Sequence, residues 1–120
     1  MSRLFQRCAF VAMTTTDLAR ARKFWVKQMG FPVVIQKRGE YFMVDAAGMR
    51  LCVDLADGGA HRGPGSDPVI GLKVASLEKT LAGLKRRSVN PSAPPVRARR
   101  GSYAELTDPD GRRVVITEVD

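Results

Sequence analysis

The two halves of this 120-residue sequence carry the same succession of motifs, and this internal repeat restricts the fold more than any other feature. Each half alone offers one helix and too little sheet to bury its apolar face, so the two halves, or halves of two chains, must cover each other. The offset between matching motifs grows from 59 to 63 residues, which predicts a four-residue insertion before the third strand of the second half. The matching motifs are Asp17-Leu18 with Ser76-Leu77 and Asp45-x-x-Gly48 with Asp108-x-x-Gly111.

The first half predicts one helix among four short strands. Asp17 is the best helix N-cap, because its carboxylate can accept hydrogen bonds from the unpaired first N–H groups. An apolar stripe follows at three- and four-residue spacing, and Gly30 stands where a helix ends in the left-handed conformation. The stripe consists of Leu18, Ala21, Phe24, Trp25 and Met29, interrupted by Gln28, and the strands are expected at 8–13, 31–36, 40–45 and 49–55.

The second half predicts the same plan. Ser76 caps a helix whose stripe is Leu77, Leu81 and Leu84. Three prolines at 90–95 exclude a helix or a central strand there. Strands are expected at 69–74, 102–107 and 112–119, the last two joined by a turn at 108–111. The Gly- and Pro-rich stretch 57–68 is a linker, so we expect one domain, 1–120, with module one at 8–56 and module two at 69–119.

The composition indicates a globular cytoplasmic protein. The net charge of +8 is spread along the chain without a recognised nucleic-acid motif, so we interpret it as a solvated surface. No apolar run is long enough to span a bilayer, and the N-terminus does not resemble a signal peptide. Cys8 and Cys52 are therefore expected as reduced thiols that pack as small apolar residues. The only histidine, His61, falls in the linker and is expected to be a surface side chain.

At this point the sequence resembles the vicinal-oxygen-chelate superfamily, which groups glyoxalases, ring-cleaving dioxygenases and bleomycin-resistance proteins. The resemblance is carried by residues 17–25, by Met29-Gly30-Phe31 and by Asp108-Pro109-Asp110-Gly111. It implies an α+β fold of two βαβββ modules that form a curved sheet with a cleft. It also implies a homodimer, because members of this fold often dimerise.

The resemblance also gives the positions at which the family's enzymes hold a divalent metal. Counted from the shared motifs, these positions are Phe10, Cys52, Val69 and Val115. Three of the four offer no donor atom, and a lone thiol does not hold Mg²⁺, Mn²⁺ or Zn²⁺. The sequence therefore predicts no metal site and no other cofactor.

Strand alternation then predicts the cleft-facing residues. If Cys52 faces the cleft, so do Arg50 and Asp54, while Met49, Leu51, Val53 and Leu55 face the helix. A basic loop, Arg97 to Arg100, is expected at the cleft mouth. The alternative is that the cleft-facing residues only fill the space between modules or form a dimer interface. The candidate ligand-binding residues are Phe10, Tyr41, Met43, Arg50, Cys52, Asp54, Lys73, Tyr103, Glu105, Arg113 and Val115.

Three functions remain open from the sequence. The first is metal-free binding of a small aromatic or anionic molecule in the cleft, similar to drug-sequestering members of the family. The second is a metal-independent isomerase, cyclase or lyase that uses Glu105, Asp54 or Tyr103 for acid–base chemistry. The third is a regulatory or structural dimer without a small ligand. Neither a membrane nor a nucleic acid is expected as a partner.

Overall fold

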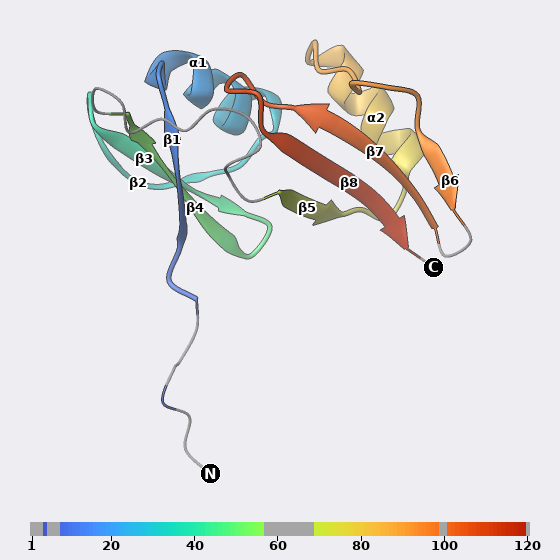
Figure 1. Cartoon of the computed structure of the whole chain (residues 1–120), viewed down its shortest axis with the longest axis horizontal. Helices are drawn as coiled ribbons and strands as arrows, with labels where there is room; N and C mark the ends of the chain where they lie inside the picture. The colour runs from blue at the N-terminus through green and yellow to red at the C-terminus, as the bar shows by residue number, and fades with distance from the viewer. Residues whose placement is uncertain (1–3, 5–7, 57–68, 99–100, 120) are drawn as a thin grey trace. The chain divides into compact units, whose positions relative to one another are not determined.

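The computed structural model describes residue 4 and residues 8–56, 69–98 and 101–119. These residues belong to two compact units, unit 1 (Met1–His61) and unit 2 (Arg62–Asp120), each with its own four-stranded sheet and helical segment. Figure 1 shows the element order, and the predicted α+β class with two βαβββ modules is confirmed. The predicted linker, 57–68, and His61 within it lie outside the described residues.

Unit 1 begins with a strand, crosses through a helix and ends with three antiparallel strands. Its sheet has the order β1-β4-β3-β2, and only the pairing of β1 with β4 is parallel. That parallel pair requires a crossover, which the helical segment provides while it packs on β4. The elements are β1 (Val11–Thr15), α1 (Leu18–Arg22), η1 (Lys23–Gln28), β2 (Val33–Lys37), β3 (Tyr41–Ala46) and β4 (Met49–Leu55).

Unit 2 repeats this arrangement with the sheet order β5-β8-β7-β6. Its helix packs on β7 and β8, as Figure 1 also shows. Here again the first strand pairs in parallel with the last, and the other pairs are antiparallel. The elements are β5 (Ile70–Lys73), α2 (Leu77–Arg86), β6 (Val96–Ala98), β7 (Gly101–Thr107) and β8 (Arg113–Val119).

The strand registers make the two units equivalent residue by residue. Ala12 pairs with Cys52, and Gly71 pairs with Val115, so the offsets of 59 and 63 hold in the two parallel ladders. The predicted single insertion is wrong in detail. Lys37 pairs with Tyr41, whereas Val96 pairs with Tyr103 and the pairing continues to Ala98 and Gly101, so the β6–β7 hairpin is three residues longer than the β2–β3 hairpin. The fourth lies in the β7–β8 turn, where the offset changes from 62 to 63.

Both helices begin at the predicted caps. The Asp17 carboxylate accepts from the Arg20 N–H at 3.0 Å, and the Ser76 hydroxyl accepts from the Lys79 N–H at 3.2 Å. The first helix then widens into the π-helix η1, where the Met29 N–H bonds to the Phe24 carbonyl at 2.8 Å. This bond passes over one more residue than an α-helical bond does, a local widening found frequently at functional sites.

The core of each unit lies between its helical segment and one face of its sheet. Trp25 is fully buried, with its ring edge-on to Phe24 at a centroid distance of 4.9 Å and stacked on Phe31 at 6.2 Å. Leu51 and Val53 are fully buried, as alternation along β4 predicts. In unit 2, Ile70, Leu84, Leu106, Val114 and Ile116 are the equivalent apolar residues.

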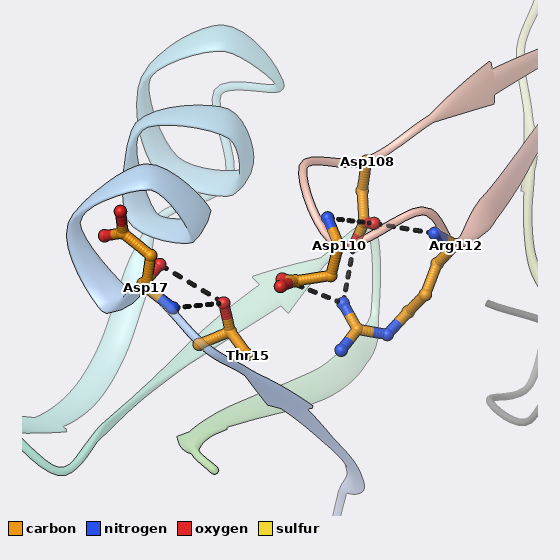
Figure 2. A network of polar contacts seen from close by, with 5 residues as sticks. All are labelled: Thr15, Asp17, Asp108, Asp110 and Arg112. Carbon is orange, nitrogen blue, oxygen red and sulfur yellow. Dashed lines mark hydrogen bonds and ion pairs between the residues drawn. The ribbon is translucent and has the colours of Figure 1, made fainter. Parts of the chain in front are cut away.

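The β7–β8 turn is held by a buried charge network, drawn in Figure 2. An Arg112 guanidinium nitrogen lies 2.6 Å from one Asp108 carboxylate oxygen and 3.5 Å from an Asp110 oxygen. The other Asp108 oxygen accepts from the backbone N–H groups of Asp110 and Arg112, at 2.9 and 2.8 Å. All three side chains are at most 9% exposed, so these bonds compensate charges that water cannot reach. Figure 2 also shows Thr15, whose hydroxyl accepts from the Asp17 N–H.

Several sequence-based expectations are wrong at the strand ends. The first strand begins at Val11, so Phe10 precedes it and is half exposed, and Val69 likewise precedes β5. Met49 and Leu55 do not pack under the helix, because at the two ends of β4 they are 46% and 44% exposed.

Two further expectations are wrong outside the strand ends. Cys8 is exposed rather than packed, unlike Cys52. Arg97, which we expected in a loop, lies in β6 because that strand pairs with β7. Within the described residues, no helix is long and apolar enough to cross a membrane.

Candidate functional site

The face of each sheet that is turned away from its helical segment carries most of the predicted site residues, and we call it the open face. Side chains on this face are half-buried or exposed, except for the buried Cys52, whereas most of their neighbours in sequence are buried against the helix. The open face of unit 1 carries Ala12, Thr14, Tyr41, Met43, Asp45, Arg50, Cys52 and Asp54. That of unit 2 carries Gly71, Lys73, Tyr103, Glu105, Thr107, Arg113, Val115 and Thr117.

The strand registers make each of these residues in unit 1 equivalent to one in unit 2. Tyr41 is equivalent to Tyr103, since each lies in the same place along the third strand of its unit. Arg50 is equivalent to Arg113, at the start of the fourth strand. Each open face therefore presents one tyrosine and one arginine on neighbouring strands, a combination suited to a flat or anionic molecule.

The open face of unit 2 holds an ion pair between neighbouring strands. The Arg113 guanidinium donates to the Glu105 carboxylate, and this hydrogen bond and the Glu105 charge raise the pKa of Arg113 above its ordinary value. The Arg113 side chain is 57% exposed and that of Glu105 34% exposed, so water screens the pair. Glu105 is thus engaged by a cation, and any acid–base role would have to act within this pair.

The open face of unit 1 lacks that pair. Its equivalent of Glu105 is Met43, which pairs with Cys52 as Glu105 pairs with Val115. Arg50 is exposed, and it forms no ion pair with any residue that the structure describes. The guanidinium on unit 1 is therefore available to an external anion in a way that Arg113 is not.

Cys52 and Asp54 lie next to each other on the open face of unit 1. The thiol sulfur lies 3.8 and 3.9 Å from the two Asp54 carboxylate oxygens. Burial, and then the negative charge of Asp54, raise the pKa of Cys52 above its ordinary value. The thiolate is the nucleophilic and metal-binding form of cysteine, so this environment favours the unreactive thiol.

The four positions at which related enzymes would hold a metal do not fit one here. Phe10, Val69 and Val115 have side chains without a donor atom, and Cys52 is kept as a thiol. The partners in the parallel pairs, Ala12 beside Cys52 and Gly71 beside Val115, supply none either, and the Glu105 carboxylate opposite Val115 on β7 is bound by Arg113. Among the described residues, no three His, Cys, Asp or Glu side chains are grouped so that they could hold a metal ion.

The hollows in unit 1 bring together residues that sequence reasoning left apart. A hollow of about 450 Å³ at the ends of β3 and β4 joins Tyr41 and Asp54, which pair directly across the strands. Its wall also includes Gly39 and Glu40, which sequence reasoning missed because they belong to a turn and follow no alternation. Arg50 lines a smaller hollow, of about 210 Å³, together with the exposed Cys8.

The sequence profile of the Glyoxalase/Bleomycin resistance protein/Dioxygenase superfamily matches residues 7–116. The chain belongs to this superfamily. Solved structures of the superfamily's fold cover nearly the whole chain at low sequence identity, so their likeness shows the fold alone. No curated protein sequence matches the chain at a significant level.

Three of these solved structures illustrate the range of proteins that share this fold. A superfamily member from Sphaerobacter thermophilus is 20% identical, with a TM-score of 0.78 and coverage of 97% of this chain and 99% of its own. TnmS3, an antibiotic binding protein from Streptomyces sp. CB03234, is 20% identical with a TM-score of 0.76, covering 99% and 100%. The lactoylglutathione lyase from Agrobacterium tumefaciens is 14% identical with a TM-score of 0.74, covering 93% and 92%.

Proposed function

We propose that this superfamily member binds a small aromatic or anionic molecule on its open faces without a metal ion. The observation that carries the proposal is the pair of equivalent tyrosines and arginines beside positions that hold no metal donors. Stacking on a ring and pairing with a guanidinium both hold a ligand without transforming it. An antibiotic binding protein of the same fold is consistent with this function.

Arg50 and Arg113 give the two open faces different ligand preferences. On unit 2 the Glu105 carboxylate already occupies Arg113, so this face suits a neutral or flat ligand. On unit 1, Arg50 suits a carboxylate or phosphate group, while Tyr41 and Met43 offer apolar surface. We therefore expect the open face of unit 1 to prefer an anionic ligand and that of unit 2 to prefer a neutral, flat one.

Native mass spectrometry of gently purified protein, with metal analysis of the same sample, is the first test. We expect a bound organic mass that is released unchanged, without a stoichiometric metal. A stoichiometric divalent metal would contradict the proposal. Conversion of the released molecule, abolished by Glu105→Gln, would instead support the metal-independent enzyme, in which Glu105 acts as an acid or base.

The ligand so identified allows a sharper test by calorimetry. Tyr103→Ala removes a ring from the open face and is expected to weaken binding about three- to tenfold, from the usual value of an aromatic contact. Tyr103→Phe is the matched control, because it keeps the ring and loses only the hydroxyl group. Equal losses in the two variants would indicate that the hydroxyl group, and not stacking, holds the ligand.

A further inference from the structure

Unit 1 contains a third hollow, which lies beside α1 and shares only Tyr41 with the open face. It lies between the first turn of α1 and the β2–β3 turn, and encloses about 500 Å³. We call it the hairpin pocket, and the lining residues that matter here are Leu18, Arg22, Gln36, Lys37, Arg38 and Tyr41. Its volume falls within the range of small-molecule sites.

Three cationic residues, Arg22, Lys37 and Arg38, line the hairpin pocket. The Arg22 guanidinium donates to the Gln36 side-chain oxygen, which fixes it across the pocket and leaves further N–H donors on the same group. Lys37 pairs with Glu40 at 2.9 Å, and the hydrogen bond and charge of that partner raise its pKa, so it stays protonated. Arg22 and Arg38 form no ion pair with any residue in the described part of the chain.

The remaining wall of the hairpin pocket is apolar or aromatic. Leu18 and Tyr41 are half-buried there, so each keeps some surface that a ligand could cover. A flat group could pack on Tyr41 and Leu18 while an anionic group meets the guanidinium groups, which bind carboxylates and phosphates through two parallel hydrogen bonds.

Unit 2 provides an internal comparison, because it has a pocket of about 510 Å³ in the equivalent place. Five of its lining residues are the counterparts of hairpin-pocket residues at the offset of 59: Leu77, Glu78, Leu81, Pro95 and Arg97. The fold therefore produces the hollow in both units, but not its charge. Leu81 stands in place of Arg22, Glu78 in place of Ala19, and Glu118 adds a carboxylate.

We propose that the hairpin pocket is a separate binding site for a small organic anion, a phosphate ester or carboxylate that bears a flat apolar group. The proposal rests on the three cationic residues and the anchored guanidinium, which line one hollow together with Leu18 and Tyr41. Of these residues only Tyr41 also belongs to an open face, so the hairpin pocket can be tested separately from the proposed function. The equivalent pocket of unit 2 does not share this site, because Leu81 replaces the anchored guanidinium and the carboxylates of Glu78 and Glu118 outnumber its one cation, Arg97.

The test uses phenyl phosphate as the probe and the ¹⁵N-labelled full chain, followed by amide chemical shifts. We expect saturable shifts at Leu18, Arg22 and Gly39, and none at Leu77 or Ser102 in the pocket of unit 2. Benzyl alcohol, which has the ring without the charge, is expected to produce no saturable shift. Shifts confined to open-face residues such as Tyr103 would overturn this proposal while leaving the proposed function in place.

A graft of the unit 2 wall gives the decisive variant. Ala19→Glu with Arg22→Leu copies Glu78 and Leu81, residues that the same architecture already accommodates, and is expected to weaken phenyl phosphate binding at least about tenfold. The matched control, Glu78→Ala with Leu81→Arg, changes the other pocket and is expected to leave the affinity of the hairpin pocket unchanged. Unchanged affinity in the graft, or an equal loss in both variants, would refute the site.

Discussion

The buried guanidinium of Arg112 depends on the Asp108 carboxylate more than on any solvent contact. Asp108→Ala leaves that cation buried without its 2.6 Å partner and removes an acceptor from two backbone N–H groups. We expect a loss of about 3–5 kcal/mol in the free energy of unfolding, measured by urea denaturation. Glu105→Ala is the control, because it breaks the exposed pair with Arg113 and should cost about 1 kcal/mol or less. Similar losses in the two variants would contradict this account.

A second prediction at this scale concerns the Cys52 thiol. In a Cys8→Ser background, Asp54→Asn removes the negative charge that raises the pKa of Cys52, so thiolate formation should move to lower pH. The midpoint is read from the pH dependence of the iodoacetamide reaction, followed by mass spectrometry. It should still lie above the ordinary value for cysteine, since burial, the larger cause, remains. Glu40→Gln is the control. Glu40 lines the same hollow as Asp54 but lies away from the thiol, so the midpoint should not change.

At the scale of elements, the β3–β4 turn carries backbone strain. Its two central residues, Ala47 and Gly48, have φ angles of 55° and 101°, and alanine rarely adopts a positive φ. Ala47→Asn should stabilise the protein by about 0.5–1 kcal/mol, because asparagine followed by glycine is the preferred sequence for such a turn. Thermal unfolding followed by circular dichroism is the measurement. Ala47→Val, a β-branched residue in the same place, should lower the melting temperature.

Local signals predicted the elements well and their ends poorly. The caps at Asp17 and Ser76 depend on one side chain and the adjacent N–H groups, so the sequence was sufficient to find them. Strand ends depend on a partner strand: β1 begins at Val11 because pairing with β4 begins there. The π-helical widening at Phe24 was not predicted, since the apolar stripe has the three- and four-residue spacing of an ordinary α-helix.

The candidate site was predictable to the extent that it follows alternation. Alternation along β4 correctly separated Leu51 and Val53, which are fully buried, from Asp54 on the other face. It failed for Met49, because the helix covers the middle of the strand and not its end. The hollows could not be predicted, since turn residues such as Gly39 form their walls.

At the scale of the whole molecule, we predict a homodimer. Apolar side chains such as Ile35, Met49 and Val69 are 46–51% exposed on the single chain, and a partner would cover some of them. Light scattering at micromolar concentration should give a mass of about twice 13.2 kDa. Because each chain carries a net charge of +8, added salt should strengthen the association by screening repulsion. A mass of one chain at all salt concentrations would exclude the dimer.

The three residues that lengthen the β6–β7 hairpin show where this architecture accommodates insertions. Both parallel ladders keep the same register although one hairpin is longer than its counterpart, so the sheet does not depend on the length of that connection. The tip of the shorter β2–β3 hairpin, at Arg38 to Glu40, is therefore a natural place to insert a peptide tag or to graft a recognition loop. A lineage that lengthened this turn would acquire a new specificity without disturbing the core.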